Sequence, residues 1–293
     1  MGKYELSERQ ACRIMEISRS VYRYQAKKTD DSQLIKELKA LAADQPRWGF
    51  WKMYQRLRNQ GKSYNHKRVY RVYKAQNLHL RVKPKKRLPS RNPRPLKQPE
   101  HPNEVWSFDF MSDSLACGRP FRTLNIIDDF NREGLWIEID TALPSARVIR
   151  VLEYLADCRG LPAYLRSDNG PEFISKVLAG WAKAHQITLD FIEPGKPAQN
   201  AYIERFNRSY REEVLDMYLF SSLDQARSQT ETWLHTYNCI RPHDALDGMT
   251  PHLYLHHYFQ KQKTAKTKKN YAKNKQQQQK QQPKTNKDTD SNT

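Results

Sequence analysis

Short apolar runs alternate with amphipathic stretches through the middle of the chain. Runs rich in β-branched and aromatic residues predict strands, and the short spacers between the first of them favour an antiparallel meander. The predicted strands cover residues 105–111, 121–127, 134–139, 163–166 and 187–192. Apolar positions at helical spacing predict helices over 145–159, 176–185 and about 199–216. The predicted order of three strands, helix, strand, helix, strand, helix indicates an α/β fold.

The N-terminal part of the chain has a different pattern, in which every predicted element is a helix. A capping-box pattern at Ser7 begins one helix, and a short helix follows over 18–24. A second pair is predicted over 49–59 and 67–76, with Asn65 capping the latter. Paired short helices of this kind are typical of a helix-turn-helix unit.

The polar face of the helix predicted over 67–76 is basic. Its outward residues include Lys67, Arg68, Arg71 and Lys74. We therefore expect this helix to contact DNA, with the helix lying in a groove. The alternative is a small helical bundle whose charges serve only solubility.

The distribution of charge along the chain supports DNA contact on two flanks. The net charge is +19, made up of +18 in residues 1–100, −7 in 101–260 and +8 in 261–293. An acidic centre between basic arms suits metal binding in the middle and phosphate contact on either side. A solvated basic surface would explain the arms but not the acidic motifs between them.

Several protein classes are excluded by the composition. No stretch approaches about 18 apolar residues, so no membrane span is expected, and the N-terminus lacks an apolar signal region. The cysteines are scattered without a Cys-x-x-Cys pair, which indicates reduced thiols; they are Cys12, Cys117, Cys158 and Cys239. We expect a cytoplasmic protein that acts on DNA.

These patterns divide the chain into four regions. A helix-turn-helix region covers residues 1–80, and a basic, proline-rich linker follows over 81–100. The α/β catalytic core covers 101–260. Residues 261–293 are rich in Lys, Gln and Asn, a composition that predicts a disordered tail.

Three carboxylates are the candidates for chemistry. Asp109 lies inside an aromatic strand, where burial of its charge is costly unless the group lies at a rim or binds a cation. Asp168 follows the strand over 163–166, and the carboxyl ends of such strands are where ligands gather. Glu204 follows after 35 intervening residues and lies on the last helix of the core. Carboxylates are suited to hard divalent cations, so these three could hold two metal ions that cut and join phosphodiester bonds.

The last core helix also presents candidates for phosphate contact. Asn200, Glu204 and Arg208 are four residues apart and share a face. Lys196 and Gln199 precede the helix together with Asn200, where backbone N–H groups and a cation favour phosphate. We expect DNA contact from Lys196, Gln199, Asn200 and Arg208; simple helix capping is the alternative.

Other residues of similar chemistry are assigned to structural roles. Asp113, Asp128 and Asp129 also lie near strand ends, and Glu172 is assigned either to the rim of the site or to the surface. His252 and His256 have no accompanying cysteine pair, which argues against a zinc domain. Gly61-Lys62-Ser63 lacks the earlier glycine of a phosphate-binding loop, so ATP use is not expected; His243 is assigned to the structure.

The motifs around the three carboxylates resemble the DDE integrase core of insertion-sequence transposases. The matching segments are Asp109, Asp168-Asn169-Gly170-Pro171-Glu172-Phe173, Pro194 to Asn207 with Glu204, and Tyr237-Asn238 through Arg241-Pro242-His243 to Thr250-Pro251. The segments Pro46–Phe50 and Asn65–Arg71 resemble the helix-turn-helix region that precedes this core. The chain is similar to the downstream-frame product (OrfB) of the family numbered three.

This resemblance implies an RNase H-like fold, with a mixed five-stranded sheet and flanking helices after an all-α helix-turn-helix region. It implies a polynucleotidyl transferase that uses Mg²⁺, or Mn²⁺ in its place, with Asp109, Asp168 and Glu204 as both catalytic residues and metal ligands. The substrates would be the terminal inverted repeats of the element and target DNA. The family also implies an upstream-frame product or frameshift fusion as partner, and a homo-oligomer on DNA.

Two other functions remain open from the sequence. A retroviral-type integrase or an RNase H-like nuclease would share the carboxylate chemistry. The missing zinc motif argues against the first, and the two flanking basic regions argue against the second. A non-catalytic DNA-binding regulator with an inactive core is an alternative of another class, and loss of divalent-metal binding would favour it.

Overall fold

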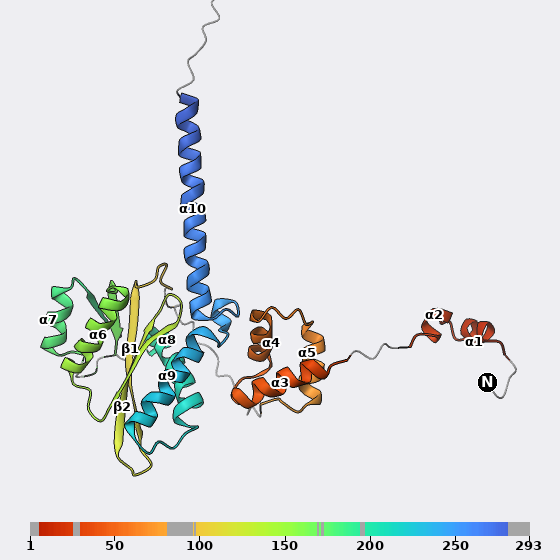
Figure 1. The fold of residues 1–293 in the computed structure, drawn as a ribbon, viewed down its shortest axis with the longest axis horizontal. Coiled ribbons are helices and arrows are strands. Elements are labelled where there is room, and N and C mark those ends of the chain that lie inside the picture. The colour runs from red at the N-terminus through yellow and green to blue at the C-terminus, as the bar shows by residue number, and fades with distance from the viewer. Residues whose placement is uncertain are drawn as a thin grey trace, which may run out of the picture.

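A five-stranded mixed sheet forms the centre of the larger folded unit (Figure 1). The computed structural model describes residues 6–25, 30–80, 96, 98–168, 170, 173–193 and 197–280. The strand order is β3-β2-β1-β4-β5, in which the first three are antiparallel and β4 and β5 continue parallel to β1. The strands are β1 (Val105–Ser114), β2 (Pro120–Asp128), β3 (Glu133–Asp140), β4 (Tyr164–Ser167) and β5 (Thr188–Phe191). The predicted meander and the predicted order of elements are confirmed.

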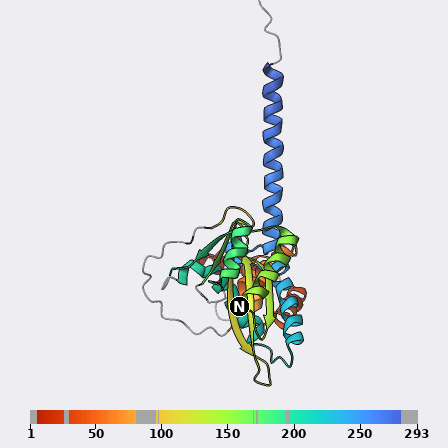
Figure 2. The same ribbon diagram turned by 90° about the vertical axis from the view of Figure 1, so that its left-hand side faces the viewer.

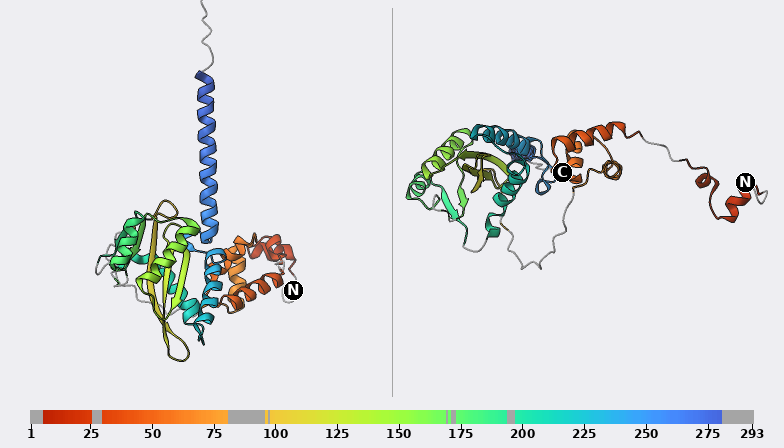
Figure 3. Two further views of the ribbon diagram at one scale, coloured as in Figure 1. Left: turned by 60° about the vertical axis from the view of Figure 1, so that its left-hand side comes forward. Right: turned by 90° about the horizontal axis from the view of Figure 1, so that it is seen from below.

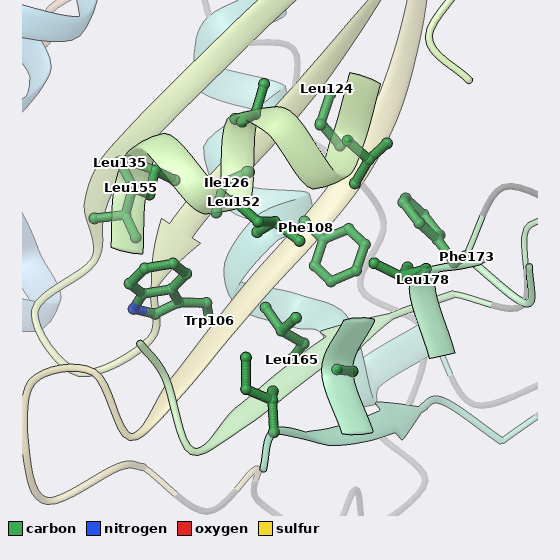
Figure 4. Packing of buried hydrophobic residues seen from close by; sticks show 14 of the residues in the cluster. Trp106, Phe108, Leu124, Ile126, Leu135, Leu152, Leu155, Leu165, Phe173 and Leu178 are labelled. Atoms are coloured by element: carbon green, nitrogen blue, oxygen red, sulfur yellow. The ribbon is translucent and has the colours of Figure 1, made fainter. Parts of the chain in front are cut away.

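Helices cover both faces of this sheet. On one face lie α6 (Ser145–Arg159) and α7 (Lys176–Ala184), and their apolar sides pack against Trp106 and Phe108 of β1 (Figure 4). The other face carries α8 (Ala201–Tyr210) and α9 (Leu223–Cys239), which pack against alternate residues of the same strands. Because successive strand side chains point to opposite faces, both sides of the sheet are buried.

Close approach of β3 to the second helical layer depends on one glycine. A Cβ at Gly134 would lie 2.5 Å from Leu234 Cδ1 and 2.7 Å from Phe206 Cε2. The amide of Asn238 on α9 donates to the Gly134 carbonyl at 2.8 Å and accepts from the Gly134 N–H at 2.9 Å. A side-chain amide thus satisfies backbone groups at a point where the β2–β3 register shifts. Helix α9 is thereby tied to the sheet.

The helix predicted over 199–216 is divided into three pieces. A 3-10 turn, η1 (Pro197–Asn200), leads into α8, and a π-helical turn, η2 (Arg211–Leu215), follows α8. The π turn contains Glu213, whose carboxylate accepts from the buried Arg241 guanidinium at 2.7 Å and from Trp233 Nε1 at 2.9 Å. This buried ion pair provides a tertiary reason for the local change in helical pitch.

The N-terminal region consists of helices, as predicted. Helix α1 begins with the capping box at Ser7, and Asn65 accepts from the Lys67 N–H at the start of α5. The helices are α1 (Glu8–Ile14), α2 (Arg19–Tyr22), α3 (Ser32–Asp44), α4 (Phe50–Asn59) and α5 (His66–Ala75). Helices α1 and α2 lie apart from the rest in Figures 1 and 3. Helix α3 was not predicted; it buries Leu34 and Leu38 against α4 and α5.

The unit formed by α3, α4 and α5 rests against the end of the core. Asn59 Nδ2 donates to the Gly248 carbonyl at 3.0 Å, and Ile240 packs on the apolar cluster of this unit. Burial, together with the nearby charge of Arg241, lowers the pKa of Lys52 on α4 to about 8. The two folded units are therefore in direct contact.

The prediction of a disordered tail from residue 261 is wrong for residues 261–280. Helix α10 (Pro251–Lys280) continues through them and projects away from the core (Figures 1 and 2). The stretch contains no Gly or Pro after Pro251 and is rich in Lys and Gln, which are good helix formers. Residues 281–293 lie outside the described part of the chain, as does the linker 81–100 apart from residues 96 and 98–100.

The helices of the described part of the chain include none that combines the length and apolar character needed to cross a bilayer.

Candidate active site

The pairing of the central strands positions the first two candidate carboxylates. Asp109 lies on β1 directly opposite Asn125 of β2. On its other side β1 runs parallel to β4, with Ser107 opposite Arg166. Because Asp168 lies two residues beyond Arg166 and Asp109 two beyond Ser107, this register carries both aspartates to the same level of the sheet.

The loop that carries Asp168 is held by local hydrogen bonds and by aromatic packing. Asp168 Oδ1 accepts from the Gly170 N–H at 3.1 Å, and the Ser167 hydroxyl donates to the Asp168 carbonyl at 3.0 Å. Downstream, the Phe173 ring stacks on Phe110 of β1 at a centroid distance of 4.8 Å. It also meets Phe108 edge to face at 4.4 Å, a packing visible in Figure 4. The loop after β4 is therefore fastened to the strand that carries Asp109.

Helix α8 brings the third carboxylate to the same region. Its buried side includes Ile203 and Phe206, which pack in the second core cluster, while Glu204 between them is exposed. Asn207 lies one turn after Glu204, and its Nδ2 donates to Asp109 Oδ2 at 2.8 Å. A single turn of α8 thus carries Glu204 and also Asn207, which donates a hydrogen bond to Asp109.

Asn207 is a site residue that was not assigned a role from the sequence. Its Oδ1 accepts from Asn125 Nδ2 at 2.7 Å, so a chain of amides runs from β2 through α8 to Asp109. Both amides are buried. The signal available in the sequence was a polar residue at helical spacing from Ile203 and Tyr210, on the apolar side of the helix.

The electrostatics of Asp109 reflect its burial and the negative charges of the other two candidate carboxylates. Burial raises the pKa of Asp109 to about 6, and the negative charges of Asp168 and, to a smaller extent, Glu204 act in the same direction. Hydrogen bonds from the Phe110 N–H and the Asn207 amide partly offset this rise. The site is therefore a concentration of negative charge whose ionised form is unfavourable without a cation.

The carboxylates are not drawn together as a closed metal-binding cluster. Among the described residues, no group of three His, Cys, Asp or Glu side chains is placed to hold one metal ion. Asp109 and Asp168 are half-buried, whereas Glu204 is exposed on α8. The chemistry of the donor set still fits hard divalent cations, which prefer carboxylate oxygens.

Sequence comparison identifies the family. The family model described as "Integrase core domain" matches residues 99–197, and a second model of the same description matches 185–251. An "HTH-like domain" model matches residues 29–87. An uncharacterised 31.7 kDa protein of insertion element IS407 from Burkholderia multivorans is 40% identical over 85% of this chain and 90% of its own length. This chain belongs to the integrase-core family of insertion-element transposases.

A second insertion-element protein agrees with this assignment. An uncharacterised 39.2 kDa protein of insertion element IS476 from Xanthomonas euvesicatoria is 39% identical to this insertion-element chain, over 86% of it and 73% of the relative. Among solved structures, the HTLV-2 integrase catalytic core domain in complex with magnesium (trimeric form) is 20% identical, with a TM-score of 0.43, over 52% of this chain and 96% of that one. The strand order and the family match together identify an RNase H-like integrase core, as predicted.

The predicted DNA contacts near α8 lie in different environments in this transposase-family core. Arg208 is exposed on the same helix as Glu204. Gln199 is engaged locally, because its Oε1 accepts from the Glu193 N–H at 2.8 Å and its Nε2 donates to Glu193 Oε1 at 3.1 Å. Asn200 is 4% exposed, so it is covered by protein rather than presented to DNA. Lys196 lies outside the described residues.

The predicted basic face of α5 is split into free and paired cations. Arg68 donates to Asp31 Oδ1 at 2.7 Å, and Arg71 donates to Asp31 Oδ2 at 2.7 Å. Lys67 and Lys74 are exposed, and neither forms an ion pair with any other residue that the structure describes. Arg68 and Arg71, two of the four predicted DNA-contacting cations, thus connect α5 to Asp31 at the start of α3.

The acidic residues assigned to structure have arginine partners. Asp128 and Asp129 are fully buried and meet Arg159 and Arg166 at 3.4 and 3.0 Å. Asp113 meets Arg211 at 3.3 Å. Glu172 lies outside the described residues.

Two of the three histidines singled out in the sequence, His243 and His252, contact groups of the core. Burial lowers the pKa of His243 to about 3, and its Nε2 lies 3.1 Å from the Tyr237 carbonyl. His252 contacts Glu133 at 3.1 Å through Nε2 and Cys239 Sγ at 3.0 Å through Nδ1. The cysteine beside His252 comes from 13 residues away.

Proposed function

We propose that this chain is a metal-dependent DNA strand transferase that cuts at the ends of its insertion element and joins the freed 3′-hydroxyl to target DNA. The observation that carries the proposal is that Asp168 after β4 and Glu204 on α8 add their negative charges to burial in raising the pKa of Asp109 on β1. Perturbed carboxylates of this kind cluster at functional sites.

Asp109, Asp168 and Glu204 are the residues that would hold Mg²⁺, or Mn²⁺ in its place. A pair of such ions, when bound, would activate the attacking oxygen and stabilise the leaving oxygen of a phosphodiester. Holding them requires the exposed Glu204 side chain to turn toward the two aspartates. The like charges around Asp109 supply the electrostatic drive for cation binding.

The protein's own groups orient this site. Asn207 fixes one oxygen of Asp109, and the Phe110 N–H fixes the other at 2.8 Å. Phe110 and Phe173 form an apolar wall behind the aspartates. Arg208, which is exposed on the helix that carries Glu204, would contact a DNA phosphate.

The unit of α3, α4 and α5 would contact DNA outside the cleavage site. The free cations Lys67 and Lys74 of α5 are the groups we assign to phosphate contact. The matched HTH-like family and the net basic charge of this region support this assignment. Assembly as a homo-oligomer on DNA, and dependence on an upstream-frame product, are part of the same proposal.

The test is strand nicking and joining on labelled DNA that carries the terminal repeat of the element. Asp109→Asn, Asp168→Asn and Glu204→Gln should each lower the rate by at least about 100-fold, because a bound metal ion contributes several kcal/mol to catalysis. DNA binding should be retained. Glu153→Gln and Asp157→Asn on the exposed side of α6 are the matched controls.

Activity that survives in Glu204→Gln, or that is unchanged by EDTA, would contradict the proposal. Metal-independent DNA binding without any product, from this chain and from a frameshift fusion alike, would instead indicate a non-catalytic regulator.

A further inference from the structure

An exposed cluster of aromatic rings lies on the HTH-like unit and has no role in the chemistry proposed above. The cluster, here called the aromatic platform, consists of Phe50, Trp51, Tyr54, His66 and Tyr70. Trp51 is 60% exposed and Tyr70 is 51% exposed. Phe50 and Tyr54 are partly buried and pack against the core of the same unit, whereas Trp51, His66 and Tyr70 lie exposed on its outer side. Contiguous exposed apolar surface of this kind marks an interaction site.

The rings are held in defined positions. Phe50 meets Trp51 edge to face at 5.0 Å and Tyr70 edge to face at 5.1 Å. The planes of Trp51 and His66 lie within 25° of each other at a centroid distance of 6.4 Å. The platform therefore joins the start of α4 to the start of α5 and presents flat ring surfaces to solvent.

A shallow depression of about 370 Å³ lies over the platform and is lined by Phe50, Trp51, His66, Lys67 and Tyr70. A lysine thus lines the depression together with the rings. On α5, residues three and four apart share a face, so Lys67, Tyr70 and Lys74 form one stripe with an aromatic ring between two ammonium groups.

The charge around the platform selects the kind of partner. Residues 46–80 contain nine Lys or Arg and not one Asp or Glu. A second copy of this surface would be repelled by like charge, and an acidic partner needs no row of flat rings. A strand of DNA supplies both phosphates for the lysines and planar bases for the rings.

We propose that the aromatic platform stacks an unpaired nucleobase of a DNA strand whose adjoining phosphates contact Lys67 and Lys74. In a duplex the faces of the bases are covered by their neighbours, and only the base edges are accessible in the grooves. Exposed rings of Trp51 and Tyr70 match base faces, so they suit a base that has left the stack or lies in a single-stranded extension. The inference rests on the proposed function in one respect, that DNA is the substrate.

The experiment compares two DNAs bound by the full chain: a plain duplex, and the same duplex with a short single-stranded extension that contains 2-aminopurine. Wild type should bind the extended DNA more tightly and quench the 2-aminopurine fluorescence. Trp51→Ala and Tyr70→Ala should each weaken binding of the extended DNA by about 5- to 100-fold. Binding of the plain duplex should change less than about twofold.

Two further variants control for folding and for general loss of an aromatic ring. Trp51→Phe keeps a flat face and should retain most of the quenching. Tyr164→Ala removes a ring that is 44% exposed on β4 of the core, and it should bind both DNAs as wild type does. A thermal melt by circular dichroism confirms that each variant is folded.

Three outcomes would overturn the inference. Equal weakening of both DNAs by Trp51→Ala would show a groove contact in duplex DNA. No weakening of either would show that the platform does not bind DNA. Loss of self-association by Trp51→Ala in sedimentation, with DNA binding intact, would show an interface between copies.

The catalytic proposal can fail separately from this one. If strand cutting is absent while 2-aminopurine quenching and its loss in Trp51→Ala are observed, only the proposed function falls. If cutting depends on Glu204 but wild type does not quench the base, only the base-stacking inference falls.

Discussion

Glu133 and Asp109 lie on the same sheet, and their surroundings shift the pKa of the carboxyl group in opposite directions. Glu133 begins β3 and is 8% exposed, yet its pKa falls to about 2, because hydrogen bonds from His252 and Asn131 and the charge of Arg159 outweigh the cost of burial. Asp109 on β1 has no cation beside it among the described residues, and its pKa rises to about 6. Burial alone does not distinguish the two; the partners do.

Partners lower the pKa of a buried carboxylate only where they outweigh the cost of burial, since Asp129 has a pKa raised to about 6 even beside Arg166. A buried charge that holds a fold together is surrounded by its counter-charges. A site that must accept cations from solution leaves its carboxylates facing one another. The cations of α5 show a similar contrast, since Arg68 and Arg71 share the single negative charge of Asp31 while Lys67 and Lys74 have no acidic partner among the described residues.

The largest expected effect on stability comes from Glu133→Gln. This change leaves the Arg159 guanidinium, which lies 3.2 Å from Glu133, with a weakened set of counter-charges in a buried position. We expect the free energy of unfolding at neutral pH to fall by about 3 kcal/mol. Urea denaturation measures it, and strand transfer per folded molecule should be unchanged. A Glu133→Gln protein as stable as wild type would show that the charge of Glu133 does not stabilise the fold.

Asp109→Asn should act in the opposite direction on stability. The pKa of this group is 3.8 in a model peptide and about 6 in the folded chain, so the folded state binds the proton more tightly. Its contribution to stability is present below pH 3.8 and is lost as the pH rises through about 6. At pH 7 without metal, the neutral amide should therefore stabilise the fold by about 1–3 kcal/mol.

The measurement for Asp109→Asn is urea denaturation of both proteins in EDTA across this pH range. The gain of the variant over wild type should grow from pH 4 to pH 7. A gain that is constant with pH, or a loss at pH 7, would show that the folded chain does not disfavour the ionised Asp109.

Asn207→Ala tests the amide that holds Asp109. Removal of this donor frees one oxygen of Asp109 and leaves Asn125 Nδ2 without its acceptor. We expect strand transfer to fall about tenfold, corresponding to about 1.4 kcal/mol for one charge-assisted hydrogen bond. Asn131→Ala, which removes a donor to Glu133 at 3.0 Å, is the matched control and should affect stability without affecting catalysis.

The smallest effects are expected on α5. Lys67→Ala and Lys74→Ala should each weaken DNA binding a few-fold and reduce the slope of log affinity against log salt by about 0.9. Arg68→Ala should instead destabilise the HTH-like unit, because it breaks the contact with Asp31. Equal salt slopes for the lysine variants and wild type would remove Lys67 and Lys74 from the phosphate contacts.

Local patterns in the sequence predicted much of the core. Runs rich in β-branched and aromatic residues identified the strands, and helical spacing identified α6 and α7. The motifs around Asp109, Asp168 and Glu204 identified the candidate carboxylates before any geometry was available. The strands and helices are predicted correctly because each is decided within a few residues of the chain, and the roles of the three carboxylates stay a prediction.

Features that depend on remote contacts could not be predicted in this way. Asn207 and Asp109 are separated by 98 residues, and Arg68 and Asp31 by 37. The basic face of α5 is visible in the sequence, but its partial neutralisation by Asp31 is not. Likewise, the local pattern over 199–216 gives a single helix, whereas the Glu213–Arg241 ion pair accompanies the π turn.

The prediction for the tail failed for a different reason. Residues 261–280 have few apolar side chains, which led to the prediction of disorder. Low hydrophobicity argues against a packed core, but it does not argue against a helix made of good helix formers. The composition of residues 261–280 indicates that they do not pack in a core, and this was wrongly taken to mean that they form no helix.

The contact between α4 and residues 240–248 has a consequence for how the chain is held together. The covalent path from the HTH-like unit to the core runs through the segment after Leu80, while Asn59 and Gly248 join the same two units across 189 residues. The HTH-like unit and the core are thus joined twice, once by the covalent chain and once by the non-covalent contact between Asn59 and Gly248. If a protease cuts the connecting segment, the non-covalent contact should still hold the two units together. The two fragments are then expected to elute together under native conditions. Such a nicked molecule would reveal how much of the affinity between the units is supplied by tethering alone.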